Sequence, residues 1–391
     1  MEKHDVIVLG AGAAGLYCAI EAARRGRRVV VLDHAKAPGE KIRISGGGRC
    51  NFTNLQIAPE RFLSQNPRFA LSALRRYTQH DFIARVNAAG IAWHEKTLGQ
   101  LFCDGSAGQI VDMLLRDLAA AGGVLRLGVT PREIGHDGSF VVRTDDGAFR
   151  APRLVVATGG KSIPKMGATG LGYRIAEQFG LRLVETRPGL VPLTFGPEVL
   201  DPLRPLAGIA VPARVSCGKA AFEEGLLFTH RGLSGPSILQ ISSYWREGDS
   251  LRVNLAADRD VAADLAAIKA SQGRIAVKTA LARILPERLA QVVAERLALK
   301  GNLADQSKAA MAALTAAVTE WEVKPNGSEG YRTAEVTLGG VDTRDLDART
   351  MEARGVPGLY FIGEVVDVTG WLGGYNFQWA WSSGWAAGQA V

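Results

Sequence analysis

Cysteine is scarce in this chain, and its cysteines carry no metal-binding or disulfide pattern. The 391 residues include four cysteines. None of them stands in a Cys-x-x-Cys motif or at zinc-ligand spacing from a histidine. Such sparse cysteines argue against a structural zinc and against the disulfide framework of a small secreted domain. We therefore expect no metal and reduced thiols at the four positions, Cys18, Cys50, Cys103 and Cys217.

Long apolar runs are missing as well. Hydrophobic residues make up 47% of the chain, but no uninterrupted stretch reaches the roughly 18 residues of a membrane span. Met1 leads almost directly into the first predicted strand, without the basic and apolar regions of a signal peptide. These absences predict a cytoplasmic globular protein that has no membrane partner. Its length favours two or three domains.

Positive charge is in excess, and it is unevenly placed. The net charge is +7, and 13 Lys/Arg stand against four acidic residues between Arg24 and Arg85. The arginines at 24, 25, 27 and 28 follow a predicted helix, where cations are favoured at the C-terminal end. The surplus continues beyond them, and phosphates are the usual partners of such clusters. Nucleic acid therefore stays a candidate partner.

Glycine is plentiful, and its first cluster is the most informative feature of the sequence. The opening Asp-Val-Ile-Val-Leu-Gly-Ala-Gly-Ala-Ala-Gly is a strand that runs into the G-x-G-x-x-G spacing. Gly10 permits the tight turn, Gly12 lets the backbone approach a pyrophosphate, and Gly15 lets the next helix pack on the strand. We expect Ala14 to lie in the same cofactor-binding turn, and Asp33, which ends the next strand, to accept hydrogen bonds from a ribose. This motif predicts a dinucleotide, either NAD or FAD.

Three more glycine-rich segments follow predicted strands, at 45–48, 159–160 and 370–374. Loops at the carboxyl ends of parallel strands meet in one crevice. FAD is longer than NAD and can stretch along such a crevice, so the recruitment of both chain ends favours FAD. The residues expected to bind it from these loops are Lys41, Arg43, Gly47, Gly48, Arg49, Cys50, Asn51, Thr158, Gly159, Gly160, Gly363, Glu364, Gly374, Tyr375 and Asn376.

The C-terminal segment predicts how the cofactor site is completed. Gly363 and Glu364 follow an apolar strand and offer an amide and a carboxylate for ribityl or ribose hydroxyls. A final helix over 376–390 would point its N-terminal amides, near Tyr375 and Asn376, at the flavin pyrimidine ring. A helix N-terminus at that place stabilises negative charge on the reduced ring.

The order of predicted elements divides the chain into a discontinuous α/β domain and an insert. We predict a Rossmann-like FAD-binding domain over 1–188 and 333–391. The insert has a β-rich part over 189–256, then a helical subdomain and return segment over 257–332. It contains no second G-x-G-x-x-G after a strand. NAD(P)H, if it is the electron donor, would therefore dock transiently at the flavin face.

Several blocks resemble the signature motifs of the BaiN/YhiN flavoproteins, a group also described as aminoacetone-oxidase-like. Most specific is Gly-Glu-Lys-Ile-Arg-Ile-Ser-Gly-Gly-Gly-Arg-Cys-Asn-Phe-Thr-Asn at 39–54. The resemblance implies an FAD domain of the two-dinucleotide-binding type with a family-specific insert. Members have been linked to aminoacetone oxidation, to reduction of steroid double bonds and to reduction of a uridine in large-subunit ribosomal RNA. The other matching blocks lie at 157–164, 167–173, 227–236, 334–341 and 358–376.

The chain departs from that family pattern in two places that could touch a substrate. Leu-Phe-Cys-Asp at 101–104 stands where a Phe-Pro pair is usual. Trp371 and Leu372 precede the double glycine where smaller or polar residues are common. Trp371 is a candidate for stacking on a base or another ring. These departures suggest a divergent branch of the family.

A flavin supplies hydride chemistry, so the protein must add orientation and a proton donor. The candidates in ligand-like contexts are Cys50, His230 and Tyr375; His230 belongs to the insert, which would have to fold over the flavin. The leading interpretation is an NAD(P)H-driven FAD oxidoreductase that reduces an activated C=C bond. The best candidate for its substrate is a uridine in large-subunit ribosomal RNA, which would become dihydrouridine. An oxygen-using oxidase of an aminoacetone-like amine, or a reductase of a small enone, is the enzymatic alternative. A non-catalytic, flavin-dependent RNA-binding or assembly module is the alternative of another class.

Overall fold

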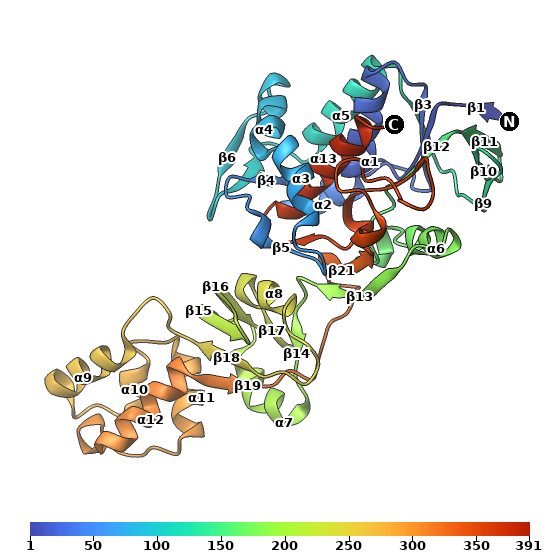
Figure 1. The fold of residues 1–391 in the computed structure, drawn as a ribbon. Coiled ribbons are helices and arrows are strands. Elements are labelled where there is room, and N and C mark those ends of the chain that lie inside the picture. Colours follow the sequence, from blue (N-terminus) through green and yellow to red (C-terminus); the bar gives the residue numbers. More distant parts are fainter. The chain divides into compact units, whose positions relative to one another are not determined.

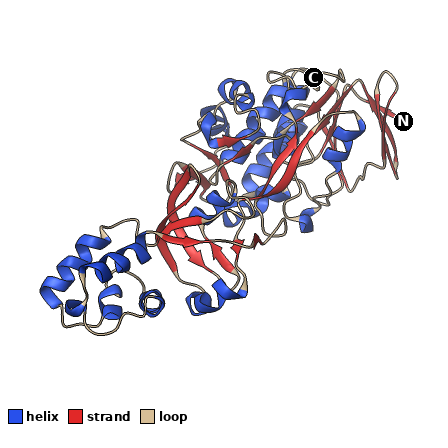
Figure 2. Ribbon diagram, turned by 60° about the horizontal axis from the view of Figure 1, so that its bottom comes forward, coloured by secondary structure: helices blue, strands red, loops and turns tan.

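The computed structural model describes all 391 residues, in two compact units (Figure 1). The first unit combines Met1–Arg187 with Val336–Val391, and the second is Pro188–Glu335. Each unit has its own sheet and its own helices (Figure 2). No helix in either unit is long and apolar enough to cross a membrane.

A five-stranded parallel sheet forms the centre of the first unit, in the order β22-β12-β2-β3-β8. Every residue of β2 is buried. Such uninterrupted apolar strands are typical of a parallel sheet that is covered on both faces. The α/β fold class predicted from the first turn is therefore confirmed. The strands are β2 (Val6–Leu9), β3 (Val29–Asp33), β8 (Val124–Leu127), β12 (Arg153–Val156) and β22 (Leu359–Phe361).

The last helix of the chain, α13 (Tyr375–Gly388), packs directly on the first, α1 (Ala13–Arg24) (Figure 1). Glycines make this close approach possible. A Cβ atom at Gly384 would lie 2.6 Å from the carbonyl oxygen of Ala14, and one at Gly388 would lie 2.9 Å from that of Cys18. The other helices of this unit are α2 (Glu40–Gly48), α3 (Phe69–Arg76), α4 (Gln79–Ala88), α5 (Gly108–Ala120) and α6 (Leu171–Gln178).

The four clustered arginines after α1 all have partners within the protein. Two of them bind the C-terminal residue and so tie the two chain ends together. The other two form ion pairs with nearby acids. These arginines therefore have structural roles, whatever the rest of the positive surplus does. The contacts join Arg24 to Glu21 (3.2 Å), Arg25 to the Val391 carbonyl (3.1 Å), Arg27 to the same carbonyl (3.2 Å) and Arg28 to Asp5 (3.0 Å).

Smaller sheets surround the central one. The sequence pattern gives no sign of the three-stranded sheet β4-β7-β6, which forms part of the candidate site. The strands of that sheet are β4 (Asn51–Asn54), β7 (Gln100–Cys103) and β6 (Trp93–Glu95). The remaining strands are β1 (Glu2–Lys3), β5 (Phe62–Leu63), β9 (Glu133–His136), β10 (Phe140–Thr144), β11 (Gly147–Ala151), β13 (Leu183–Gly189), β21 (Val336–Val341) and β23 (Thr369–Gly370).

The second unit holds a seven-stranded antiparallel sheet, in the order β19-β18-β15-β16-β17-β14-β20, and a group of helices. Buried and exposed residues alternate along most of β15, as expected when one face packs on a core. Strands β19 and β20 come after the helices in sequence, so the return segment completes this sheet. The strands are β14 (Leu193–Thr194), β15 (Ala210–Cys217), β16 (Ala220–Phe228), β17 (Gly232–Ser234), β18 (Leu251–Asn254), β19 (Trp321–Val323) and β20 (Gly327–Ser328). The helices are α7 (Pro197–Leu200), α8 (Pro236–Ser242), α9 (Val261–Gln272), α10 (Val277–Leu281), α11 (Glu287–Arg296) and α12 (Lys308–Thr319).

Candidate functional site

Two of the three glycines in the first turn are required by the protein itself. Gly10 has a φ of +110°, and a Cβ there would lie 2.3 Å from the carbonyl oxygen of Ala157. A Cβ at Gly15 would lie 2.0 Å from the carbonyl oxygen of Gly10. A side chain at either position would therefore push β2, α1 and the end of β12 apart.

Gly12 differs from both. Its φ is −84°, which any residue can adopt, and a Cβ there would meet no atom within 4 Å. It is the N-cap residue of α1, whose first amides receive no side-chain cap. Elsewhere, side chains of Asp260 and Ser307 cap α9 and α12. Open space before uncapped amides is what a pyrophosphate needs, so this turn fits a dinucleotide.

Asp33 holds the first turn in shape. Its Oδ2 accepts a hydrogen bond from the amide of Ala11 at 2.6 Å, and its Oδ1 accepts one from the amide of Ala35 at 2.8 Å. A carboxylate has about four acceptor positions, so these two amides leave capacity for a hydroxyl. The expected hydrogen bond to ribose stays a prediction.

Glu364 connects three segments of the first unit. Its Oε2 is 2.5 Å from Lys41 Nζ, and its Oε1 accepts hydrogen bonds from Ser162 Oγ at 3.0 Å and from the Thr337 amide at 2.9 Å. A Cβ at Gly160 would lie 2.7 Å from the same Oε1. The carboxylate that the sequence assigns to cofactor hydroxyls is thus already occupied by protein donors, and it positions Lys41.

The 45–48 segment is expected to be a loop, but it forms the end of a kinked helix. Within α2, the backbone leaves helical geometry from Ser45 to Gly47. A Cβ at Gly46 would lie 2.7 Å from the ring of Phe102, whereas one at Gly47 would meet nothing within 4 Å. Gly159 also faces open space, with a φ of +71°. Nearby, Gly48 is partly exposed, Arg43 and Arg49 are exposed, and Thr158 has a buried hydroxyl without a hydrogen-bond partner.

The β4-β7-β6 sheet brings this loop to the start of α13. The side-chain amide group of Asn51 lies 3.3 Å from Gln100 Oε1. A Cβ at Gly373 would lie 2.9 Å from the Gln100 side chain, and one at Gly374 would lie 2.4 Å from the carbonyl oxygen of Thr53. The glycine loops at 45–51 and 370–374 therefore lie close together in the structure. The sequence missed the strand that joins them, which carries the 101–104 block that departs from the family pattern.

An aromatic and cationic cluster lies at the N-terminal end of α13. The guanidinium of Arg61 lies 5.3 Å from the ring centre of Trp371 and 5.8 Å from that of Tyr375. It also donates hydrogen bonds to the Tyr375 hydroxyl and to Gln56 Oε1. The Tyr375 hydroxyl in turn donates to the Gln56 carbonyl at 3.3 Å. Arg61 was not among the predicted site residues, because it stands in no glycine-rich motif.

Asn376 fixes the turn before that helix. Its Oδ1 accepts a hydrogen bond from the Gly370 amide at 2.9 Å, and its Nδ2 donates to the Gly370 carbonyl at 2.9 Å. Gly374, the N-cap residue of α13, supplies no side-chain cap. The turn before α13 is therefore held in place, and its N-cap residue, like Gly12 in α1, supplies no side-chain cap.

The other two candidate proton donors occupy very different surroundings. Cys50 is fully buried at a φ of +52°, and burial raises the pKa of its thiol far above the usual range. A fully enclosed thiol with a raised pKa favours a packing role for Cys50. His230 is exposed in the turn between β16 and β17, in the second unit.

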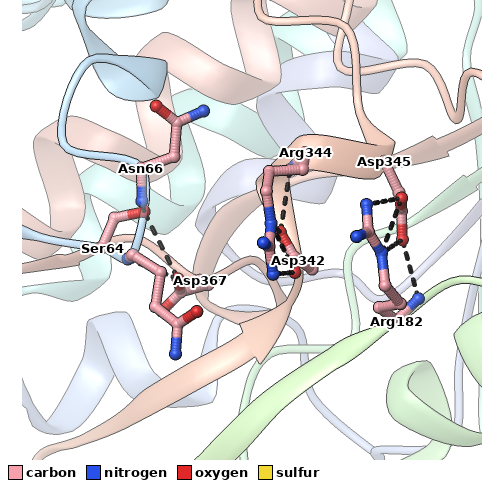
Figure 3. A network of polar contacts seen from close by, with 8 residues as sticks. Ser64, Asn66, Arg182, Asp342, Arg344, Asp345 and Asp367 are labelled. Carbon is pink, nitrogen blue, oxygen red and sulfur yellow. Dashed lines mark hydrogen bonds and ion pairs between the residues drawn. The ribbon is translucent and has the colours of Figure 1, made fainter.

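Figure 3 shows a network of polar contacts in the first unit. Arg182 binds Asp345 and holds the pKa of that carboxyl below its usual range. Asp367 is 4% exposed, and burial raises the pKa of its carboxyl although it accepts a hydrogen bond from the Gln65 amide at 2.8 Å. A third pair, Arg344 and Asp342, completes the network.

A hollow of about 640 Å³ lies at the other end of α13, between its last residues and the 347–357 loop. At about 1.5 Å per residue, the length of the helix puts it roughly 20 Å from the glycine turns. It is lined by Arg76, Arg349 and Arg354, among others. The candidate cofactor site is therefore distinct from this hollow.

Comparison with known proteins gives consistent matches along the whole chain. The family model described as HI0933-like protein Rossmann domain matches residues 4–390. A protein of Escherichia coli (strain K12) named ribosomal RNA dihydrouridine synthase is 53% identical over 396 residues, which cover 100% of this chain and 98% of that protein. The 3-dehydro-bile acid delta(4,6)-reductase of Clostridium scindens is 29% identical, with 98% of each chain covered.

Among solved structures, the chain is similar to 3-ketosteroid-delta4-(5alpha)-dehydrogenase from Rhodococcus jostii RHA1. The TM-score is 0.51 at 15% sequence identity, with 99% of this chain and 97% of that chain covered. At this identity the likeness concerns the fold alone. It agrees with the α/β architecture of the first unit.

Proposed function

This chain belongs to the HI0933-like Rossmann family of FAD-dependent oxidoreductases, and on that premise we propose that it reduces a uridine of large-subunit ribosomal RNA to dihydrouridine. The observation that carries the proposal is the 53% identity to a ribosomal RNA dihydrouridine synthase over the full length of both chains. The basic composition, with a net charge of +7, suits a polyanionic substrate.

FAD, when bound, supplies the hydride chemistry of the reaction. The amides at the start of α1, opposite the open space at Gly12, would hold its pyrophosphate. Lys41, fixed by Glu364, would add a positive charge near the same loops. The N-terminal end of α13, which begins after Gly374, would favour negative charge on the cofactor ring.

The substrate would lie against the cluster of Arg61, Trp371 and Tyr375. An aromatic face with a guanidinium over it suits a flat ring attached to a phosphate backbone, because the indole can stack on the base while the cation attracts phosphate. Gln56 adds an exposed amide group beside them. These four side chains offer ring stacking, charge and hydrogen bonding in one place.

Of the three predicted proton donors, we favour Tyr375. Its hydroxyl receives a hydrogen bond from Arg61, which stabilises the negative charge left when the proton leaves. Saturating a C=C bond needs one hydride and one proton, so the phenol would deliver the proton to the carbon next to the one that receives hydride. NAD(P)H would restore the electrons, and the setting would be the cytoplasm.

The proposal is tested by mapping dihydrouridine in ribosomal RNA from cells with and without the gene, using mass spectrometry. We expect one dihydrouridine in the large subunit to disappear and to return when the gene is restored. A Gly12→Ala copy should restore it poorly. An unchanged map in the deleted cells would overturn the proposal.

Reduction of a small enone is the second candidate, because the relative in Clostridium scindens is named as a bile acid reductase and matches 98% of this chain. Its 29% identity is much lower than that of the ribosomal RNA enzyme. Purified protein that oxidises NAD(P)H with a steroid enone but leaves unmodified ribosomal RNA untouched would favour this candidate.

A further inference from the structure

One exposed residue near the candidate site has an unfavourable backbone conformation. Leu98 lies in the loop between β6 and β7 with a φ of +52°, in the left-handed region that disfavours branched side chains. Its side chain is also 54% exposed, so this strain is not offset by burial in a core. Cys50, Leu190 and Met351 share a positive φ, but they are at most 1% exposed.

Backbone hydrogen bonds hold the loop that carries Leu98. The amide of Lys96 donates to the Gln100 carbonyl at 3.0 Å, and the amide of Gln100 donates to the Thr97 carbonyl at 3.0 Å. The amide of Leu55 donates to the Gly99 carbonyl at 2.8 Å, which fixes the loop to the chain after β4. An exposed apolar side chain on such a loop is presented in one fixed place.

The side chain of Asn54 links the loop that carries Leu98 to the candidate cofactor site. Its Nδ2 donates hydrogen bonds to the carbonyl of Leu98 at 3.1 Å and to the carbonyl of Gly373 at 2.8 Å. The same side chain therefore holds both the strained leucine and the glycine turn that opens α13. A Cβ at the next residue, Gly99, would lie 3.1 Å from the side chain of Gln56, which binds Arg61.

An enzyme that acts on a uridine in folded RNA needs an apolar side chain of this kind. Its ring is stacked between neighbours, and a base must leave its stack before an enzyme can act on its ring atoms. Proteins that open a base stack insert apolar side chains, leucine among them, into the gap. Local backbone strain is retained at sites where function requires it.

We propose that Leu98 is an apolar wedge that fills the gap in the RNA stack when the target uracil turns toward the flavin. This role rests on the proposed function and deepens it, because it assigns the site a folded polynucleotide rather than a free nucleoside. Leu98 is then a positioning residue: it keeps the RNA open while the cluster around Trp371 receives the base.

The decisive variant is Leu98→Asn, because asparagine tolerates a positive φ and removes the apolar side chain. We expect the variant holoenzyme to melt at the same temperature as the wild type or higher, to keep its FAD and to be reduced by NAD(P)H at an unchanged rate. Its kcat/KM for folded, unmodified large-subunit ribosomal RNA should fall at least about tenfold. On the same RNA unfolded by heat and low salt, the loss should be smaller.

Two control variants sharpen the test. Leu98→Met keeps the apolar volume and should keep most of the activity on folded RNA. Ala298→Gly relieves a positive φ of +50° in the second unit and should change neither activity nor FAD content. Full activity of Leu98→Asn on folded RNA would overturn the wedge, as would an equal loss on folded and unfolded RNA. If the wild-type holoenzyme reduces neither RNA, the proposed function itself fails, which is a different result.

Discussion

Gly15 and Gly12 stand three residues apart in the same turn, yet they are glycines for different reasons. A side chain at Gly15 would collide with the backbone, since its Cβ would lie 2.0 Å from the Gly10 carbonyl oxygen. A side chain at Gly12 would meet nothing within 4 Å, and its φ of −84° suits any residue. The protein needs Gly15 in order to fold. At Gly12 no contact within the protein requires glycine, and we propose that the open space there serves a bound ligand.

The largest effect is expected from Gly15→Ala. The methyl group cannot avoid the Gly10 carbonyl unless α1 moves away from β2, and this should cost well over about 3 kcal/mol of unfolding free energy. The measurement is thermal unfolding of the purified protein, together with its soluble yield. A variant that folds and melts like the wild type would show that the turn is looser than described.

Gly12→Ala should affect the cofactor instead. The methyl group would occupy the space left for the pyrophosphate, so we expect the Kd for FAD to rise about 100-fold or more. The unfolding free energy of the FAD-free protein should change by less than about 1 kcal/mol. Flavin fluorescence titration and urea unfolding measure the two quantities. If Gly12→Ala destabilised the apoprotein as much as Gly15→Ala does, the contrast between the two glycines would be lost.

The Tyr375→Phe variant tests whether the hydroxyl group at the N-terminal end of α13 takes part in the reaction. The change removes the hydroxyl that contacts Arg61 and Gln56 but keeps the ring. We expect FAD to stay bound and kcat for RNA reduction to fall about 100-fold, the usual scale for losing a proton donor. Rapid mixing should show that reduction of the bound flavin by NAD(P)H keeps its rate. If kcat were unchanged, the proton would have to come from another group.

The Glu364→Gln variant tests a carboxylate that already accepts hydrogen bonds from other residues of the protein. Glutamine can still accept hydrogen bonds from Ser162 and Thr337, but it loses the ion pair with Lys41. We expect a loss of about 1 kcal/mol in unfolding free energy, because Lys41 is partly exposed and can turn to water, with a several-fold weaker affinity for FAD. A loss of FAD binding as large as that of Gly12→Ala would instead assign the carboxylate to the cofactor.

The smallest effects are expected in the network of Figure 3, where two carboxylates should respond to pH in opposite directions. The lowered pKa of Asp345 means that its charge stabilises the fold above the unfolded pKa, and this contribution is lost as the pH falls through the lowered folded pKa. Asp345→Asn should therefore cost less than about 1 kcal/mol at pH 7, since Arg182 is half exposed, and progressively less as the carboxyl group becomes protonated in acid.

Asp367 has a raised pKa, so its stabilising contribution belongs to low pH and is lost as the pH rises through the folded pKa. Asp367→Asn should be at least as stable as the wild type at pH 7, and this advantage should shrink near pH 4. Urea unfolding of both variants, followed from pH 7 down into the acid range, measures both changes. Parallel responses of the two variants would contradict the assigned pKa directions.

The sequence predicted the elements that follow from local pattern. The glycine turn indicated the α/β fold, and the final helix, expected over 376–390, runs from Tyr375 to Gly388. The strand that links the two glycine loops was missed, because Gln100–Cys103 is short and lies far from them in sequence. Arg61 was missed for a similar reason: only the fold brings it to Trp371 and Tyr375.

The sequence alone also could not show which titratable group is the better candidate for the proton donor. Cys50 and Tyr375 both stand in glycine-rich motifs, but one is enclosed at a left-handed turn and the other binds an arginine. The surroundings of a side chain come from several segments at once. A motif identifies the residue, whereas packing decides which groups its side chain contacts.

The most direct test uses purified wild-type and Gly12→Ala protein on large-subunit ribosomal RNA from cells that lack the gene. Each protein is incubated with NAD(P)H and limiting FAD, and dihydrouridine is then counted by mass spectrometry. We predict that the wild type converts one uridine and that Gly12→Ala, although folded, does so only when FAD is in large excess. Formation of no dihydrouridine by FAD-loaded wild-type protein would contradict the account.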